Sequence, residues 1–188
     1  MLSLTSLAIL NKKEEIVRLL QNGANVNEQD GFGDTALYFA CQYTHIELVE
    51  ILLQNKNINV NMQSGIGYSP FYVACWSNSY ETALLMLQDP RVDINLVNDL
   101  GWSPLMYACY GGRTKFVQLL ISFGRYIDVH KKSTKDDHYL GIKSGSTALD
   151  MAKQKNSADI VQLLQQYQNN PKETQKTTRN ELNLKGKK

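Results

Sequence analysis

The hexapeptides Ser69-Pro70-Phe71-Tyr72-Val73-Ala74 and Ser103-Pro104-Leu105-Met106-Tyr107-Ala108 start 34 residues apart and share one pattern: a hydroxyl residue, proline, three large residues and alanine. The pattern recurs without the proline as Thr35-Ala36-Leu37-Tyr38-Phe39-Ala40 and as Thr147-Ala148-Leu149-Asp150-Met151-Ala152. A degenerate first copy runs from Ser3 to Ala8. A recurrence at such a period is the signature of a repeat architecture, so the repeat decides the fold.

Each copy predicts a helix followed by a turn and a second helix. The serine or threonine caps the first helix by accepting a backbone N–H, and proline suits the next position because no donor is needed there. The second helix is clearest at Ile46–Leu53, where apolar residues recur at a spacing of three and four. A glycine stands two residues before each cap and predicts a tight turn with positive φ. These glycines are Gly33, Gly67, Gly101 and Gly145.

Composition and charge narrow the class of protein. The chain has 188 residues, of which 43% are hydrophobic, and 20 basic residues against 18 acidic ones give a net charge of +2. So small an excess argues against a dedicated nucleic-acid-binding protein. No run of apolar residues is long enough to span a membrane, and the apolar start, Met1–Leu10, has no basic residues before it, so a helix of the fold is predicted there instead of a secretion signal.

The array is expected to cover residues 1–168 in five repeats, with the first and last acting as caps. Cys41, Cys75 and Cys109 are spaced by 34 and 34 and each follows an alanine, which predicts small buried residues at helix contacts. Lys153 stands in the same column of the last repeat, as a cap exposed to solvent would require. Three cysteines without a disulfide framework favour a reducing compartment, the cytoplasm or alternatively the nucleus. Residues 169–188, rich in Lys, Thr, Asn and Gln, predict a disordered basic tail.

This organisation resembles the ankyrin-repeat family, whose units are about 33 residues long and carry the signature T-P-L-H-x-A. Thr44-His45-Ile46-Glu47 is similar to the family's G-H-L-E, and Gly23-Ala24-Asn25-Val26-Asn27 is similar to its G-A-D-V-N. The resemblance covers about residues 1–168. It implies an all-α ankyrin-repeat solenoid of helix-turn-helix units with projecting hairpin loops. It also implies a protein-interaction module (an adaptor, scaffold or regulator) with no catalysis and no cofactor.

Large side chains fill the columns that the resemblance assigns to the concave binding surface, namely the loop tips and the first helix of each repeat. Trp and Tyr are favoured anchors of interfaces. The partner is therefore expected to be a protein or peptide, and the chain by itself is expected to be a monomer. The alternative is that these side chains pack on one another and only stiffen the array. The candidate protein-binding residues are Phe32, Tyr43, Ile66, Tyr68, Trp76, Leu100, Trp102 and Tyr110.

Two alternative functions come from other parts of the chain. His130 and His138 flank Asp136-Asp137, which would allow a metal-dependent enzyme, although the spacing matches no recognised ligand pattern and a solvated loop is favoured. The basic tail would allow binding to nucleic acid or to an anionic membrane.

The fourth hairpin is longer than the others. The caps Ser103 and Thr147 are 44 residues apart, and the extra length falls between Val129 and Gly145. An enlarged, projecting tip is therefore predicted. It is either a tolerated surface insertion or a contact arm that extends the binding surface.

Overall fold

The computed structural model describes residues 2–184, and within that range it contains eleven helices and no β-strand. The chain divides into two units, residues 1–96 and 97–188. The helices of the first unit are α1 (Leu4–Ile9), α2 (Lys13–Gln21), α3 (Ala36–Gln42), α4 (Ile46–Leu53), α5 (Pro70–Trp76) and α6 (Tyr80–Gln88). Those of the second unit are α7 (Pro104–Tyr110), α8 (Thr114–Ser122), α9 (Ala148–Gln154), α10 (Ala158–Asn169) and α11 (Pro171–Glu181).

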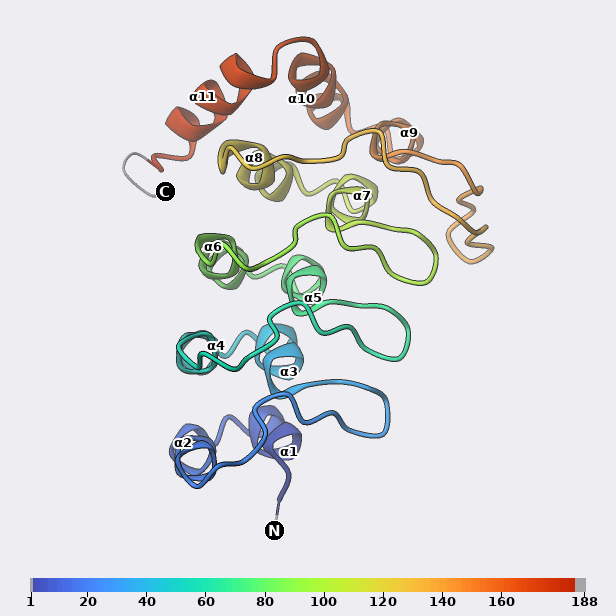
Figure 1. The fold of residues 1–188 in the computed structure, drawn as a ribbon. Helices are drawn as coiled ribbons and strands as arrows, with labels where there is room; N and C mark the ends of the chain where they lie inside the picture. Colours follow the sequence, from blue (N-terminus) through green and yellow to red (C-terminus); the bar gives the residue numbers. More distant parts are fainter. Residues whose placement is uncertain (1, 185–188) are drawn as a thin grey trace. The chain divides into compact units, whose positions relative to one another are not determined.

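The first unit is a stack of three helix pairs. The first helices of the pairs form one column, in which α3 lies between α1 and α5, and the second helices α2, α4 and α6 form a parallel column (Figure 1). We call the helices α1, α3 and α5 the inner helices, because the hairpin loops project from their side of the unit. The predicted all-α repeat solenoid is confirmed.

The predicted helix starts are confirmed at atomic detail. In the first unit the hydroxyl oxygens of Ser3, Thr35 and Ser69 each accept a hydrogen bond from the backbone N–H three residues later. Ser103 and Thr147 do the same in the second unit. These caps satisfy backbone donors that no helical carbonyl reaches, so they fix where the first helix of each pair begins.

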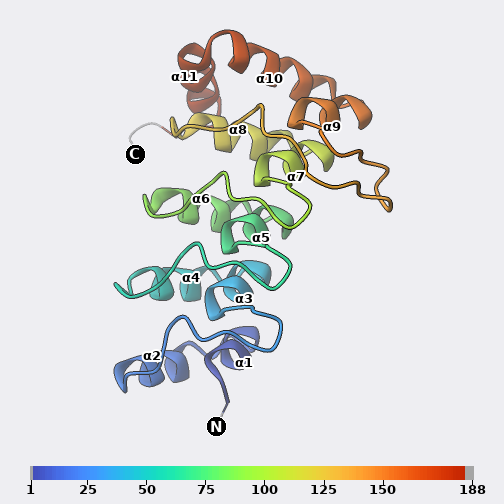
Figure 2. The same ribbon diagram turned by 45° about the vertical axis from the view of Figure 1, so that its right-hand side comes forward.

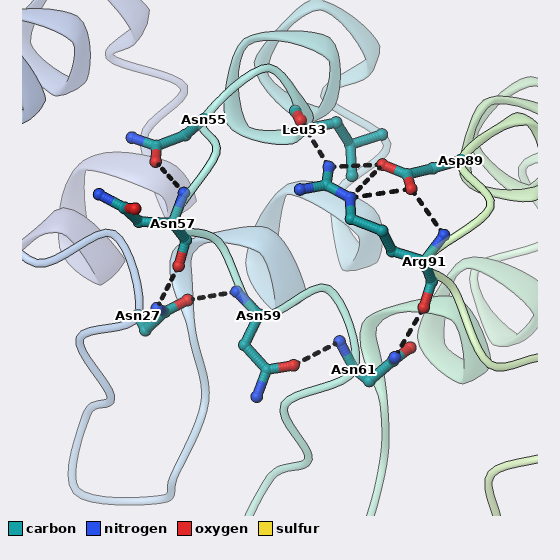
Figure 3. A network of polar contacts seen from close by, with 8 residues as sticks. All are labelled: Asn27, Leu53, Asn55, Asn57, Asn59, Asn61, Asp89 and Arg91. Atoms are coloured by element: carbon teal, nitrogen blue, oxygen red, sulfur yellow. Dashed lines mark hydrogen bonds and ion pairs between the residues drawn. The ribbon is translucent and has the colours of Figure 1, made fainter.

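Asparagine side chains tie successive repeats of the first unit together (Figure 3). The Asn27 side chain donates to the carbonyl of Asn57 at 2.8 Å and accepts from the backbone N–H of Asn59 at 2.7 Å. Asn61 repeats this arrangement one unit on, donating to the carbonyl of Arg91 and accepting from the N–H of Asp93, both at 2.8 Å. Asn27 and Asn61 therefore have a structural role, because each side-chain amide supplies a partner to backbone groups of the next repeat.

The turn inside each helix pair passes through one residue with positive φ. This column is occupied by Asn11, Thr44, Asn78, Gly112 and Asn156, with φ between 54° and 64°. Asparagine tolerates the left-handed region better than other non-glycine residues, whereas the β-branched Thr44 is strained there. The turn therefore keeps its geometry in every repeat although only one copy has glycine.

The second unit differs from the sequence expectation at its C-terminal end. The predicted disorder of residues 169–188 is wrong for Pro171–Glu181, which forms α11 and packs against α8 and α10. Asn170 caps this helix and Pro171 opens it. Residues 185–188 of the predicted tail lie outside the described residues.

The helix α11 is rich in polar residues, and two threonines explain how it can still bury one face. Thr174 and Thr178 are buried, and each donates its hydroxyl to a carbonyl one turn earlier at 2.8 Å, so neither is left without a partner. Their methyl groups are thus free to pack. At the other end of the helix, the side-chain amide of Gln118 donates to Glu181 at 3.0 Å.

The long fourth hairpin projects beside α9, as the sequence predicts (Figure 2). In the other hairpins the residues that close the tip are 4 apart, as in Asp30 and Asp34. Here Ser133 and Ser146 close it and are 13 apart. The added segment has its own antiparallel bridge between Asp137 and Ile142, and Ile142 is buried.

The cysteine column lies in the core. Cys41, Cys75 and Cys109 are all buried thiols, on α3, α5 and α7 respectively. Burial raises the pKa of the Cys41 and Cys109 thiols far above its ordinary value. Because the thiolate is the reactive form, these side chains act as small apolar residues. Lys153, in the same column of the last repeat, is exposed.

Candidate protein-binding face

Each hairpin tip of the first unit is closed by its own polar side chain. The Asp30 carboxylate accepts the backbone N–H groups of Phe32 at 2.8 Å and Asp34 at 3.0 Å. In the next hairpin the Ser64 hydroxyl accepts the N–H of Tyr68 at 3.1 Å. These local bonds hold the tips in a defined shape, so the side chains they carry are presented on rigid loops.

Successive tips approach one another at their glycines. The N–H of Gly65 donates to the carbonyl of Phe32 at 2.8 Å. Gly33 has φ +80°, and a Cβ atom there would lie 2.8 Å from the backbone nitrogen of Gly65. Glycine at position 33 is therefore required both by the turn and by the close contact between the two hairpins.

Predicted binding residues of the first unit expose large apolar surface. Phe32 is 80% exposed, Ile66 59%, Tyr43 47% and Trp76 42%. Tyr68 is half-buried, with its ring centroid 4.8 Å from that of Tyr72 and 6.2 Å from that of Trp76. We call Phe32, Tyr43, Ile66, Tyr68 and Trp76 the aromatic face; it follows the hairpin tips and the exposed ends of α3 and α5.

The predicted residues of the second unit are arranged differently. Trp102, one of the candidate binding residues, is not on the surface, because only 2% of it is accessible. Its ring packs on Tyr110 with centroids 5.5 Å apart, and the Lys155 ammonium lies 4.0 Å from the centroid of Tyr110. Leu100 and Tyr110 are half-buried. The alternative interpretation, in which these side chains pack on one another, is therefore the one seen for Trp102 and Tyr110.

The loop that carries His130 and His138 is organised by its own hydrogen bonds. Asp136 accepts the backbone N–H of Ser144 at 2.8 Å and pairs with the Lys143 ammonium at 3.4 Å. This backbone bond is the main reason that the pKa of Asp136 is lowered. Among residues 2–184, no three His, Cys, Asp or Glu side chains gather closely enough to hold a metal ion.

Sequence reasoning missed a cleft between the two hairpin tips of the first unit. It has a volume of about 510 Å³ and is lined by Phe32 and Ile66 at its rim together with Asp34 and Tyr38. The signal available in the sequence was the column after each cap glycine, which holds a carboxylate in Asp34 but aromatic rings in Tyr68 and Trp102. The sequence therefore distinguishes Asp34 from the equivalent residues of the other repeats. It does not predict the cleft, because the cleft depends on how closely the two hairpin tips approach each other.

A family model described as ankyrin repeats (3 copies) matches residues 5–98 and 84–176. The matches extend over most of the chain and include both units, so the chain belongs to the ankyrin-repeat family. Ankyrin repeats are generally protein–protein interaction modules. A search of curated proteins finds no match to the chain. Within residues 2–184, no helix is both long enough and apolar enough to cross a membrane.

Proposed function

We propose that the chain is a protein-interaction module that binds an extended segment of a partner protein on its aromatic face. The observation that carries the proposal is the exposure of Phe32, Ile66 and Trp76 on neighbouring hairpins and inner helices of one unit. Monomeric proteins seldom expose a contiguous apolar patch without using it, and aromatic anchors dominate the binding energy of interfaces.

The scaffold supports this function because the face is held rigid. Capping hydroxyls fix the inner helices, Asp30 and Ser64 fix the tips, and the Asn27 amide ties one repeat to the next. A pre-organised surface loses little conformational entropy when it binds. The extended shape of a repeat surface suits a peptide laid along it.

The test uses one defined probe, the strongest binder from a random dodecapeptide phage library selected on the intact protein (the selected peptide). Trp76→Ala is expected to weaken its binding about thirtyfold, equivalent to about 2 kcal/mol, in a fluorescence-anisotropy titration. The loss of folding stability should be smaller than the loss of affinity, because Trp76 is 42% exposed and its removal leaves little cavity.

Ile46→Ala is the matched control, since Ile46 is 38% exposed but lies at the start of α4, the second helix of its pair. It should leave the affinity unchanged. An equal loss of affinity in both variants, or a Trp76→Ala protein that is destabilised but binds normally, would remove the aromatic face as the binding surface. If no two independently selected peptides compete for the same site on the protein, the proposal that the chain is a protein-interaction module is contradicted.

A further inference from the structure

The cleft between the hairpin tips combines apolar walls with a carboxylate. Phe32 and Ile66 stand exposed at its rim, Tyr38 lies buried against it, and Asp34 is part of its lining. A ligand that fits such a cleft must offer both an apolar or flat surface and a group that satisfies a negative charge.

The surrounding sequence supplies no positive charge to Asp34. Residues 24–45 and 58–78, which form both hairpin tips and the inner helices α3 and α5, contain no lysine or arginine. The acidic residues in these two ranges are Glu28, Asp30 and Asp34. Glu28 accepts the backbone N–H of Leu4 at 3.4 Å, and Asp30 accepts two tip amides. By contrast, Asp34 Oδ1 is buried and has no hydrogen-bond partner among residues 2–184.

The burial of Asp34 Oδ1 without a partner changes the pKa of its carboxyl group. Burial, and then repulsion by Asp30, raise the pKa of Asp34 from 3.8 to about 6. An acid whose folded-state pKa is raised contributes a destabilisation that grows as pH rises from 3.8 to about 6 and is complete above that range. Near neutral pH the folded protein therefore holds a carboxylate that its own groups do not compensate.

We propose that this cleft receives a basic side chain of the bound protein segment, arginine in preference to lysine, with Asp34 as its anionic partner and Phe32 and Ile66 packed against its flat sides. The inference rests on the proposed function and names the chemistry of the partner at one position of the aromatic face. The carboxylate that destabilises the free protein becomes paired when the cleft is occupied.

Arginine suits the cleft better than lysine for two reasons. Its planar guanidinium stacks on apolar and aromatic surface, and it is more weakly hydrated than an ammonium, so it loses less on entering a partly enclosed site. It also keeps several donors in one plane for a carboxylate at the side of the cleft. Lysine offers a compact, strongly hydrated charge that leaves the walls unused.

The direct probe is N-acetyl-arginine amide, added to the isotope-labelled full chain and followed by amide chemical shifts. We expect saturable shifts at Gly33, Asp34, Gly65 and Ile66, with a dissociation constant on the order of 1 mM for so small a ligand. N-acetyl-citrulline amide, which has the same shape without the charge, should give none. N-acetyl-lysine amide should bind several-fold more weakly.

Two variants separate a site from a general attraction between charges. Asp34→Asn should weaken the arginine probe at least about tenfold. Glu81→Gln, which removes one exposed negative charge from α6, should not alter it. In the wild type the affinity should rise between pH 5 and pH 7 as Asp34 ionises. The groups that interact electrostatically with Asp34 are Asp30 and Tyr38, and burial raises the pKa of Tyr38 to about 12, so Tyr38 keeps its proton throughout this range.

The result that would overturn the inference is equal binding of the arginine and citrulline probes, or an Asp34→Asn protein that binds the arginine probe as well as the wild type. The two proposals fail separately. If the arginine probe does not bind while the selected peptide still depends on Trp76, only the basic-residue cleft is lost. If the probe binds but no peptide depends on Trp76, the cleft stands and the extended aromatic face is lost.

Discussion

Cys75→Asp is expected to lower the free energy of unfolding by about 4 kcal/mol, enough to remove much of the stability of an ordinary domain. Cys75 lies on α5, fully buried, in the column that carries the contacts between inner helices. The new carboxylate would be buried without a basic partner, because α5 and the helices α3 and α6 that pack on it hold no lysine or arginine. Urea unfolding followed by circular dichroism measures the loss.

The chain provides a control for this prediction in the same column. Lys153→Asp introduces the same side chain at the equivalent position of the last repeat, where the residue is exposed. It should lower stability by less than about 1 kcal/mol. The loss in Cys75→Asp should also shrink toward pH 5, because burial raises the pKa of the introduced acid and favours its neutral form. Equal effects of the two substitutions would mean that the repeat register is wrong.

Trp102→Ala is expected to cost about 3 kcal/mol of stability. Removing a buried tryptophan leaves a large cavity, and the loss is reduced because Trp102 Nε1 is buried without a hydrogen-bond partner among residues 2–184. Trp102→Phe should stay within about 1 kcal/mol of the wild type, since it fills most of the space and removes the unsatisfied donor. The same unfolding measurement distinguishes the two variants.

A different outcome would support the sequence-based prediction that Trp102 is a protein-binding residue. If Trp102→Ala unfolds like the wild type and yet binds the selected peptide more weakly, Trp102 acts as a contact residue and not as a packing residue. The Trp102 and Tyr110 rings would then have to be accessible to a partner.

The inner-helix starts, the cysteine column and the enlarged fourth hairpin were predictable because each follows from a local pattern repeated at a fixed period. A capping hydroxyl such as Ser69 acts on backbone groups within one turn, so sequence spacing alone specifies it. The terminal helix α11 could not be predicted from composition, because its Lys, Thr, Asn and Gln residues are typical of a disordered segment. Thr174 and Thr178 lie one helical turn apart, and that spacing was the available signal.

The fate of individual side chains in the binding columns could not be predicted in the same way. Tyr68 and Trp102 occupy the same column, yet the Trp102 ring is buried on Tyr110 while Tyr68 lies at the edge of an exposed cluster. An equivalent position in successive repeats determines where the Cα atom lies, but it does not determine which residues the side chain contacts. The unpaired state of Asp34 depends likewise on the approach of two hairpins, which spacing does not describe.

The most direct test of the binding surface is amide hydrogen exchange of the full chain with and without the selected peptide. Binding on the aromatic face should slow exchange at residues 31–34 and 64–68 and at the exposed end of α5, with α2 and α11 unchanged. Protection confined to the long hairpin at 130–146 or to α11, with the hairpin tips of the first unit unaffected, would contradict the account.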